Sequence, residues 1–156
     1  MTDLTALINR LESHIPHNEV ADPNVSRGAV GWHIAHTLLT INVVADALVS
    51  SRPEEYRWKF DWRRSFFLAI GKIPRGKIRA PEVVQVKQEL DKAALSAQVA
   101  ATREKVKALP DLQPRNFFTH PFLGKIKLKP AIKFLCIHTQ HHLKIIEDLV
   151  QAAKSK

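Results

Sequence analysis

The stretch FLCIHTQHHLKII, residues 134–146, places three histidines inside an apolar helical pattern. Successive residues of a helix lie about 100° apart around its axis, and at this spacing the polar and apolar residues fall on opposite sides. The polar side consists of Lys133, Gln140, Lys144, Glu147 and Gln151, and the apolar side of Ala131, Phe134, Leu135, Ile145, Ile146 and Leu149. The pattern predicts an amphipathic helix over residues 130–153 that buries its apolar side in a core.

Two of these histidines, His138 and His142, lie at the centre of the apolar side, and His141 lies at its border. Residues four positions apart project side by side, so both rings can reach a single metal ion. Without a metal, each buried ring needs hydrogen-bond partners, and an unmet group costs about 1–3 kcal/mol. A lone buried histidine is more often a structural residue than a ligand, but a pair at this spacing favours metal binding.

A second stretch, GWHIAHTLL at residues 31–39, carries His33 and His36 on the inward side of another apolar helix. One histidine from this helix together with His138 and His142 would complete a three-histidine site that leaves a coordination position open. The spacing alone does not choose between His33 and His36 as the third ligand. Binding requires neutral imidazoles, so the sequence also predicts that the metal is released below about pH 6.5.

The remaining apolar patterns are helical in period, and they predict an all-α fold in one domain, residues 1–156. We expect a four-helix bundle with a short extra helix in the long crossover, residues 52–80, between its second and third helices. Ser26 is placed to cap the second helix and Pro81 to open the third. Residues 71–80 and 115–129 are predicted to be loops, and no sheet is expected. The predicted helices span residues 3–15, 26–51, 54–70, 82–109 and 130–153.

Composition limits the setting in which the protein works. The single cysteine, Cys136, cannot form an internal disulfide, and no secretory leader pattern is present, which favours a cytoplasmic location. No apolar run approaches the 18 to 20 residues, roughly, that cross a bilayer, so no membrane span is expected. The net charge of +9 is consistent with acidic partners, with anionic substrates or with a surface that is simply basic, and charge alone does not choose among them.

Two further residues that could take part in chemistry, Cys136 and His120, are given roles outside the metal site. Cys136 lies about 160° from His138 around the helix, which predicts a small apolar filler and not a metal ligand. His120, in the segment FFTHPFLG, is either an ordinary packed loop residue or a group that faces the site or its substrate.

A competing reading of the chain is a nucleic-acid-binding module. Cations alternate with aromatic residues through residues 56–79, as in surfaces that contact phosphates and stack on bases. Aromatic residues in a short helix are more often core or dimer contacts, so we expect nucleic-acid binding to be the weaker alternative. The residues are Arg57, Lys59, Arg63, Arg64, Lys72, Arg75, Lys77 and Arg79, with Tyr56, Trp58, Trp62 and Phe66.

Three stretches together resemble the DinB-like superfamily, in its branch of unknown function: GWHIAHTLL, FFTHPFLGKIKLKPAIKFL and IHTQHHLKII. The resemblance covers most of the chain but is strong only there. It implies a four-helix bundle, often a homodimer, that holds a divalent metal through one histidine of the second helix and a His-x-x-x-His pair of the last. Carried over, the pair is His138 and His142, and the single ligand is His36, with His33 as the competitor.

The resemblance also implies an activity. Characterised relatives include transferases and isomerases that use a low-molecular-weight thiol such as mycothiol or bacillithiol. The leading hypothesis is therefore a metal-dependent enzyme that activates such a thiol against a small-molecule substrate, with Zn, Ni or Fe as the ion. A metal-dependent hydrolase that uses a bound hydroxide is the alternative that the sequence does not separate from it.

Overall fold

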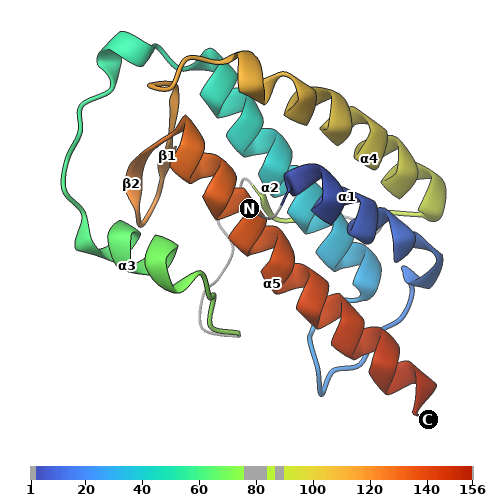
Figure 1. Ribbon diagram of the computed structural model, residues 1–156. Coiled ribbons are helices and arrows are strands. Elements are labelled where there is room, and N and C mark those ends of the chain that lie inside the picture. Colours follow the sequence, from blue (N-terminus) through green and yellow to red (C-terminus); the bar gives the residue numbers. More distant parts are fainter. Residues whose placement is uncertain (1–2, 76–83, 87–89, 156) are drawn as a thin grey trace.

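The computed structural model describes residues 3–75, 84–86 and 90–155, and in these residues the chain is mostly helical with one small sheet (Figure 1). Two strands, β1 (Phe117–His120) and β2 (Gly124–Lys127), pair in antiparallel fashion. The helices are α1 (Leu4–Ser13), α2 (Val30–Ser50), α3 (Trp62–Ile70), α4 (Lys92–Lys107) and α5 (Leu128–Lys154), with single 3-10 turns at Ile15–His17, Pro53–Glu55 and Leu109–Asp111.

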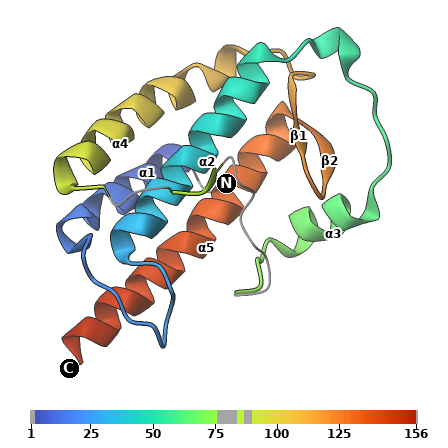
Figure 2. The same ribbon diagram turned by 180° about the vertical axis from the view of Figure 1, so that it is seen from behind.

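Four of the helices pack together. Helices α1 and α2 each contact both α4 and α5. The colour gradients in Figures 1 and 2 show that α2 and α4 run in one direction and that α1 and α5 run in the other. The hairpin and α3 lie outside this group, against α5. The long helices therefore enclose the core, and the hairpin and α3 form an addition at one side.

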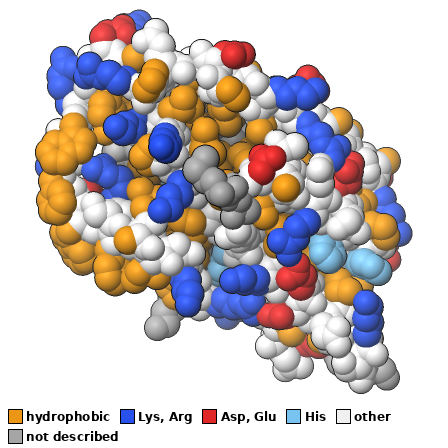
Figure 3. Space-filling model, in the orientation of Figure 1, with side chains coloured by type: hydrophobic (Ala, Val, Ile, Leu, Met, Phe, Trp, Pro, Cys, Tyr) orange, Lys and Arg blue, Asp and Glu red, His pale blue; other side chains and the backbone are white. Residues whose placement is uncertain are grey.

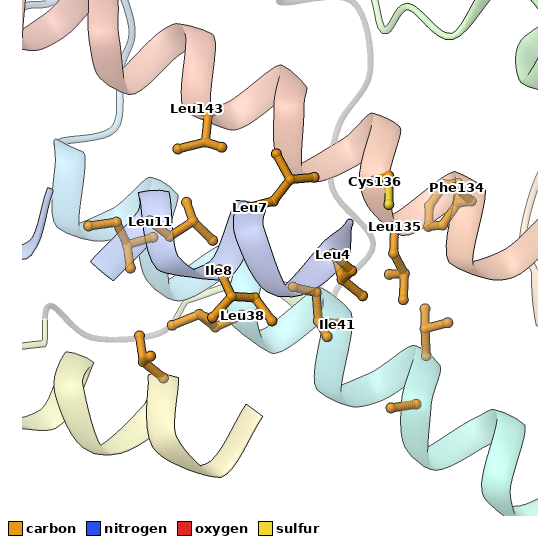
Figure 4. Packing of buried hydrophobic residues seen from close by; sticks show 14 of the residues in the cluster. Leu4, Leu7, Ile8, Leu11, Leu38, Ile41, Phe134, Leu135, Cys136 and Leu143 are labelled. Atoms are coloured by element: carbon orange, nitrogen blue, oxygen red, sulfur yellow. The ribbon is translucent and has the colours of Figure 1, made fainter. Parts of the chain in front are cut away.

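The core between these helices is built from the apolar positions that the helical pattern identified. Ile8 and Leu11 of α1, Leu38 of α2 and Leu143 of α5 have no exposed surface. Side chains of α1, α2 and α5 meet in the space between these helices (Figure 4). At roughly 25 cal/mol for each Å² of buried apolar surface, this contact is the main force that holds α2 against α5.

Helix α2 does not fit the expectation that no apolar run approaches the length needed to cross a bilayer. Over its 21 residues it is long and apolar enough to cross a bilayer by length and composition, although 61% of the relevant window is buried inside the protein. Two buried hydroxyls return hydrogen bonds to its own backbone, from Thr37 to the carbonyl of His33 and from Thr40 to that of His36. Its burial is that of a core helix, and a helix of this kind is weak evidence for a membrane span.

The expectation of a loop over residues 115–129 is wrong, because residues 117–127 form a small two-stranded hairpin. Phe118 faces Ile126 and Phe117 faces Lys127 across the pair. Gly124 begins the second strand at φ +66, a conformation that favours glycine. The alternation of lysine with Ile126 and Leu128 is a period of two, the signal of a half-buried strand, within a segment that the sequence analysis assigned to a loop.

Three predicted helix boundaries are also wrong, and capping explains two of them. Asp61 accepts a hydrogen bond from the backbone of Arg64, so the helix expected over residues 54–70 begins at Trp62. Asp91 does the same for Ala94, so the helix expected over 82–109 begins at Lys92. Residues 84–86 and 90 are not α-helical, and the predicted start at Pro81 lies outside the described residues.

The third boundary is that of α2. This helix begins at Val30 and not at Ser26. The hydroxyl of Ser26 does not cap it, and the N-cap residue, Ala29, makes no side-chain cap either. The backbone of Asn18 and Val20 accepts hydrogen bonds from Gly31 and Val30 instead. A Cβ atom on Gly31 would lie 3.0 Å from the carbonyl oxygen of Asn18, so only glycine allows this close approach. The preceding loop thus fixes the end of α2 that carries the histidines.

Candidate metal centre

The first two turns of α2 and the middle of α5 bring three histidines together. One ring nitrogen from each of His36, His138 and His142 lies within 4.8 Å of the other two. The ring centroids are 4.6 to 5.2 Å apart. This is the predicted trio, and its nitrogens are close enough for one ion to contact all three. Metal binding by these residues remains a prediction that this geometry makes chemically reasonable.

His36 is held in the form that a metal ligand requires. Its Nδ1 atom lies 2.7 Å from the carbonyl oxygen of Val84. A carbonyl can only accept, so Nδ1 carries the hydrogen and Nε2 keeps its lone pair for a ligand. The indole of Trp32 stacks on the same ring, with centroids 5.0 Å apart and planes 8° from parallel. The hydrogen bond and the stacking together fix both the tautomer and the orientation of the ring.

His138 supplies an unsatisfied buried nitrogen. Its Nδ1 atom is buried and finds no hydrogen-bond partner within the described part of the chain. The ring of Phe134 stacks on its imidazole at 6.0 Å. An unpartnered polar atom in such a place costs free energy, and a bound cation would satisfy it. The cluster therefore fits a metal better than it fits a purely structural role.

His142 contacts another buried histidine, His33. Its Nδ1 atom lies 2.9 Å from Nδ1 of His33, and Nε2 of His33 lies 2.9 Å from the hydroxyl of Ser26. Both nitrogens of His33 are thus engaged, whereas the Nε2 atoms of His36 and His142 are not used by these contacts. His33 therefore lies beside the three converging histidines, and the choice of His36 as the third ligand stays a prediction.

The environment keeps all these imidazoles neutral at pH 7. Burial is the main cause that lowers the pKa of His36, His138 and His142, and neighbouring histidines lower it further for the last two. Burial followed by repulsion from His36 lowers the pKa of His33 to about 4. Neutral imidazole is the ligand form, so these residues can bind a cation without first losing a proton.

Two residues predicted to stay out of the first coordination sphere do lie outside the cluster. The ring of His141 is half-buried and meets His142 edge-on at 5.0 Å, but its nitrogens are not among the three that converge. Cys136 is buried in the hydrophobic core, where burial raises the pKa of its thiol. A thiol with a raised pKa is a poor nucleophile and a poor ligand at neutral pH.

His120 is placed by the hairpin as a packed residue. Its Nδ1 atom accepts hydrogen bonds from the backbone of Phe122 and Leu123, which closes the turn. Its ring meets Phe134 edge-on at 5.1 Å, so Phe134 separates it from His138. Burial lowers its pKa. These contacts are those of an ordinary packed residue, the first of the two roles expected for His120. The ring of Phe134 lies between it and the metal cluster.

Three partners of the cluster were missed by the sequence analysis. Trp32 is adjacent to His33 in the sequence, and its position one turn before His36 was the available signal. Ser26 was taken as a helix cap. The carbonyl of Val84 left no signal, because any residue carries a carbonyl and the contact joins positions 48 residues apart.

The aromatic and basic segment before α3 is largely at the surface. Trp58, Trp62 and Phe66 are 70%, 64% and 61% exposed, whereas Tyr56 is buried. Figure 3 shows hydrophobic side chains gathered over this segment and α3, with lysine and arginine among them. The guanidinium of Arg63 lies 5.8 Å from the centre of the Trp62 ring. Of the two expected roles, core contact or dimer contact, the core role is therefore wrong for these three, and a role as dimer contacts stays a prediction.

The comparisons with known proteins give one match. The family model described as the DinB superfamily matches residues 8–146, a range that includes all three converging histidines. No curated protein and no solved structure matches the chain.

Proposed function

The chain belongs to the DinB superfamily, and from this membership and the geometry of the histidine cluster we propose that it is a metal-dependent enzyme. One divalent ion, Zn, Ni or Fe, is held by His36, His138 and His142. The ion activates a low-molecular-weight thiol for transfer to, or isomerisation of, a small-molecule substrate. The observation that carries the proposal is the convergence of three neutral imidazole nitrogens within 4.8 Å in a buried layer.

Each residue of the cluster has a separate role. His36 offers Nε2 because Val84 holds its other nitrogen, and His138 offers a buried nitrogen that has no partner among the described residues. Trp32 and Phe134 cover the rings of His36 and His138 and keep them in place. A divalent ion bound by three neutral ligands would keep its full charge and so lower the pKa of a thiol at an open position.

The proposal includes the expected architecture and setting. The packing of α1, α2, α4 and α5 supports a four-helix bundle, with α3 as the short extra helix in the crossover. One hydrophobic cluster that draws on all four helices supports a single domain. A homodimer and a cytoplasmic location complete the proposal, and size-exclusion chromatography with light scattering tests the first of these.

The deciding experiment is elemental analysis of protein purified without a histidine tag. Wild-type protein and the His141→Ala variant should carry about one divalent ion for each chain. His36→Ala, His138→Ala and His142→Ala should lose tight binding, while circular dichroism shows that they remain folded. If the His138 and His142 variants retain the ion, the cluster is structural and the enzyme proposal fails.

A thermal-shift screen then separates the two metal chemistries. The metal-loaded protein is titrated with cysteine, glutathione and other low-molecular-weight thiols, with their S-methyl forms as controls. Stabilisation by thiols and not by the S-methyl forms supports thiol activation. Indifference to every thiol, together with cleavage of ester or amide substrates by the loaded protein, would favour the hydrolase.

The exposed aromatic residues support nucleic-acid binding as a second candidate function. Trp58, Trp62 and Phe66 are exposed within a segment rich in lysine and arginine, and base-stacking surfaces combine exposed aromatic rings with cations. Binding to mixed-sequence RNA and DNA should weaken steeply as salt rises and should fall in a Trp58→Ser, Trp62→Ser double variant. Weak binding that salt does not change would remove this candidate.

A further inference from the structure

We infer that His33 is the positioning residue of the metal centre: it holds His142 in the tautomer and orientation that direct Nε2 of His142 at the ion. This inference rests on the proposed metal centre and adds a residue that the proposed ligand set does not contain. The observation behind it is a chain of two contacts, from Ser26 to His33 and from His33 to His142, both 2.9 Å long.

Only one placement of the ring hydrogens along this chain of contacts leaves His142 able to bind a metal. A neutral imidazole carries one hydrogen, and its other nitrogen has a lone pair. If Nε2 of His142 is the ligand, the hydrogen of this ring is on Nδ1 and is donated to Nδ1 of His33. The hydrogen of His33 must then be on Nε2, where it is donated to the hydroxyl oxygen of Ser26.

The surroundings of Ser26 agree with its role as the acceptor. Its hydroxyl oxygen also accepts from the backbone N–H of Gly28, at 3.2 Å, and an oxygen with two lone pairs can accept both bonds.

Gly28 itself permits the arrangement. A Cβ atom at this position would lie 2.8 Å from the indole of Trp32 and 3.4 Å from Nε2 of His33. A larger residue here would force either the Trp32 indole or the loop that carries Ser26 to shift. The loop before α2 is therefore built to approach His33 closely, which a histidine that merely filled space in the core would not need.

His33 cannot serve as a fourth ligand while these contacts persist, because each of its nitrogens is already engaged. Its distance in sequence from His36 places it nearly one helical turn away, beside His142. In metal centres, residues that hold a ligating histidine in this way contribute about 10- to 100-fold to metal affinity.

The test measures zinc affinity by competition with a chromophoric chelator in four proteins. His33→Leu keeps the bulk of the side chain but removes both hydrogen bonds, and it should weaken binding about 10- to 100-fold while the stoichiometry stays at one. His33→Gln supplies a carbonyl acceptor and an amide donor, and it should regain most of the lost affinity. His141→Ala is the matched control, since it removes another ring beside His142, and it should bind as wild type does.

Three results would overturn the inference. Unchanged affinity in His33→Leu would show that His142 needs no support. Loss of stoichiometric metal in both His33 variants would show that His33 is itself a ligand. Equal loss in His33→Leu and His33→Gln, at constant stoichiometry, would show that only the shape of the imidazole matters.

A second readout does not depend on metal. Long-range proton–nitrogen NMR spectra of the metal-free protein report which ring nitrogen carries the hydrogen. We expect the hydrogen of His142 on Nδ1 in wild type and a shift toward Nε2 in His33→Leu. A hydrogen on Nε2 of His142 in wild type would overturn the inference even where metal binds. If wild type binds no metal but shows the Nδ1 form, the proposed function fails and the His33 contact stands.

Discussion

The imidazoles of the cluster are distinguished by what holds each of them. His36 donates to a backbone carbonyl, His142 contacts another imidazole, and Nδ1 of His138 has no partner among the described residues. Burial lowers the pKa of every one of them. The release of metal at about pH 6.5, expected from ordinary histidine, should therefore move to lower pH in the folded protein, because protons compete less well for buried rings.

The first prediction concerns stability and pH. The pKa of His33 is lowered to about 4 in the folded protein, so the unfolded chain binds a proton that the folded chain does not. This contribution is fully present above about pH 6.5, the unfolded value, and is lost as pH falls toward 4. The urea midpoint of the metal-free protein should fall between pH 7.5 and pH 5.

The matched control for this measurement is His33→Leu. This variant lacks the titrating ring, so its urea midpoint should fall less over the same interval of pH. A wild-type midpoint that is constant from pH 7.5 to pH 5 would contradict the prediction.

The second prediction concerns Cys136. Replacement by alanine removes a small side chain from the hydrophobic core and touches none of the three converging nitrogens. The Cys136→Ala variant should keep one ion for each chain and should lose about 1 kcal/mol of stability, the scale of one buried methylene or thiol. Metal analysis and urea unfolding of the same sample measure both quantities. Loss of the ion from the folded variant would show that the thiol takes part in binding.

At the scale of elements, two side chains, Asn116 and Ser51, link the hairpin to the end of α2. Asn116 is buried, and its amide nitrogen donates to the backbone carbonyls of Leu48 and Ser51, and to the Ser51 hydroxyl. The same hydroxyl accepts from the backbone of Phe117, where the first strand begins. These contacts hold β1 at the end of α2, and they explain why the segment is an ordered hairpin and not a free loop.

The third prediction tests this attachment. Asn116→Ala removes a buried amide that donates to the carbonyl of Leu48, which still accepts from Ser51, so the free energy of unfolding should fall by about 0.5–1.5 kcal/mol, the net contribution of a typical hydrogen bond. Gln113→Ala, on an exposed side chain of the same segment, is the control and should change stability by less than about 0.5 kcal/mol. Urea unfolding followed by circular dichroism gives both values. Equal stability of the two variants would show that the hairpin is held by apolar packing alone.

At the scale of the whole molecule, the proposed ion would join α2 to α5. These two helices pack against each other, and they carry all three proposed ligands, far apart in sequence. A ligand that binds only the folded state stabilises it by mass action. The metal would therefore act on the whole fold, because the unfolded chain does not bring the two helices together.

The fourth prediction follows from this link. Zinc at 100 times its dissociation constant should stabilise the wild-type protein by about 2.7 kcal/mol and raise its melting temperature. His142→Ala should show no rise, whereas His141→Ala should behave as wild type does. Differential scanning calorimetry with and without zinc makes the comparison. A similar rise in His142→Ala would place the binding elsewhere on the molecule.

The sequence by itself determined the helical class, the buried face of the last helix and the position of His138 and His142 at its centre. These properties depend on the spacing of apolar residues along a few turns, which is local information. The choice of His36 over His33 came from family resemblance and stays a prediction, because the helical spacing of the two residues could not reveal which ring nitrogens are engaged by neighbours. The alternation around Ile126 was also local, but it was short and was assigned to a loop.

The tertiary structure alone decided which nitrogen of each ring is available. The carbonyl of Val84 and the hydroxyl of Ser26 reach the histidines from separate segments of the chain. Their residue types do not predict these contacts. Likewise, only the packed chain shows that Trp62 and Phe66 remain exposed while Tyr56 is buried. Such contacts depend on how distant segments meet, whereas the period of a helix is fixed by its neighbouring residues.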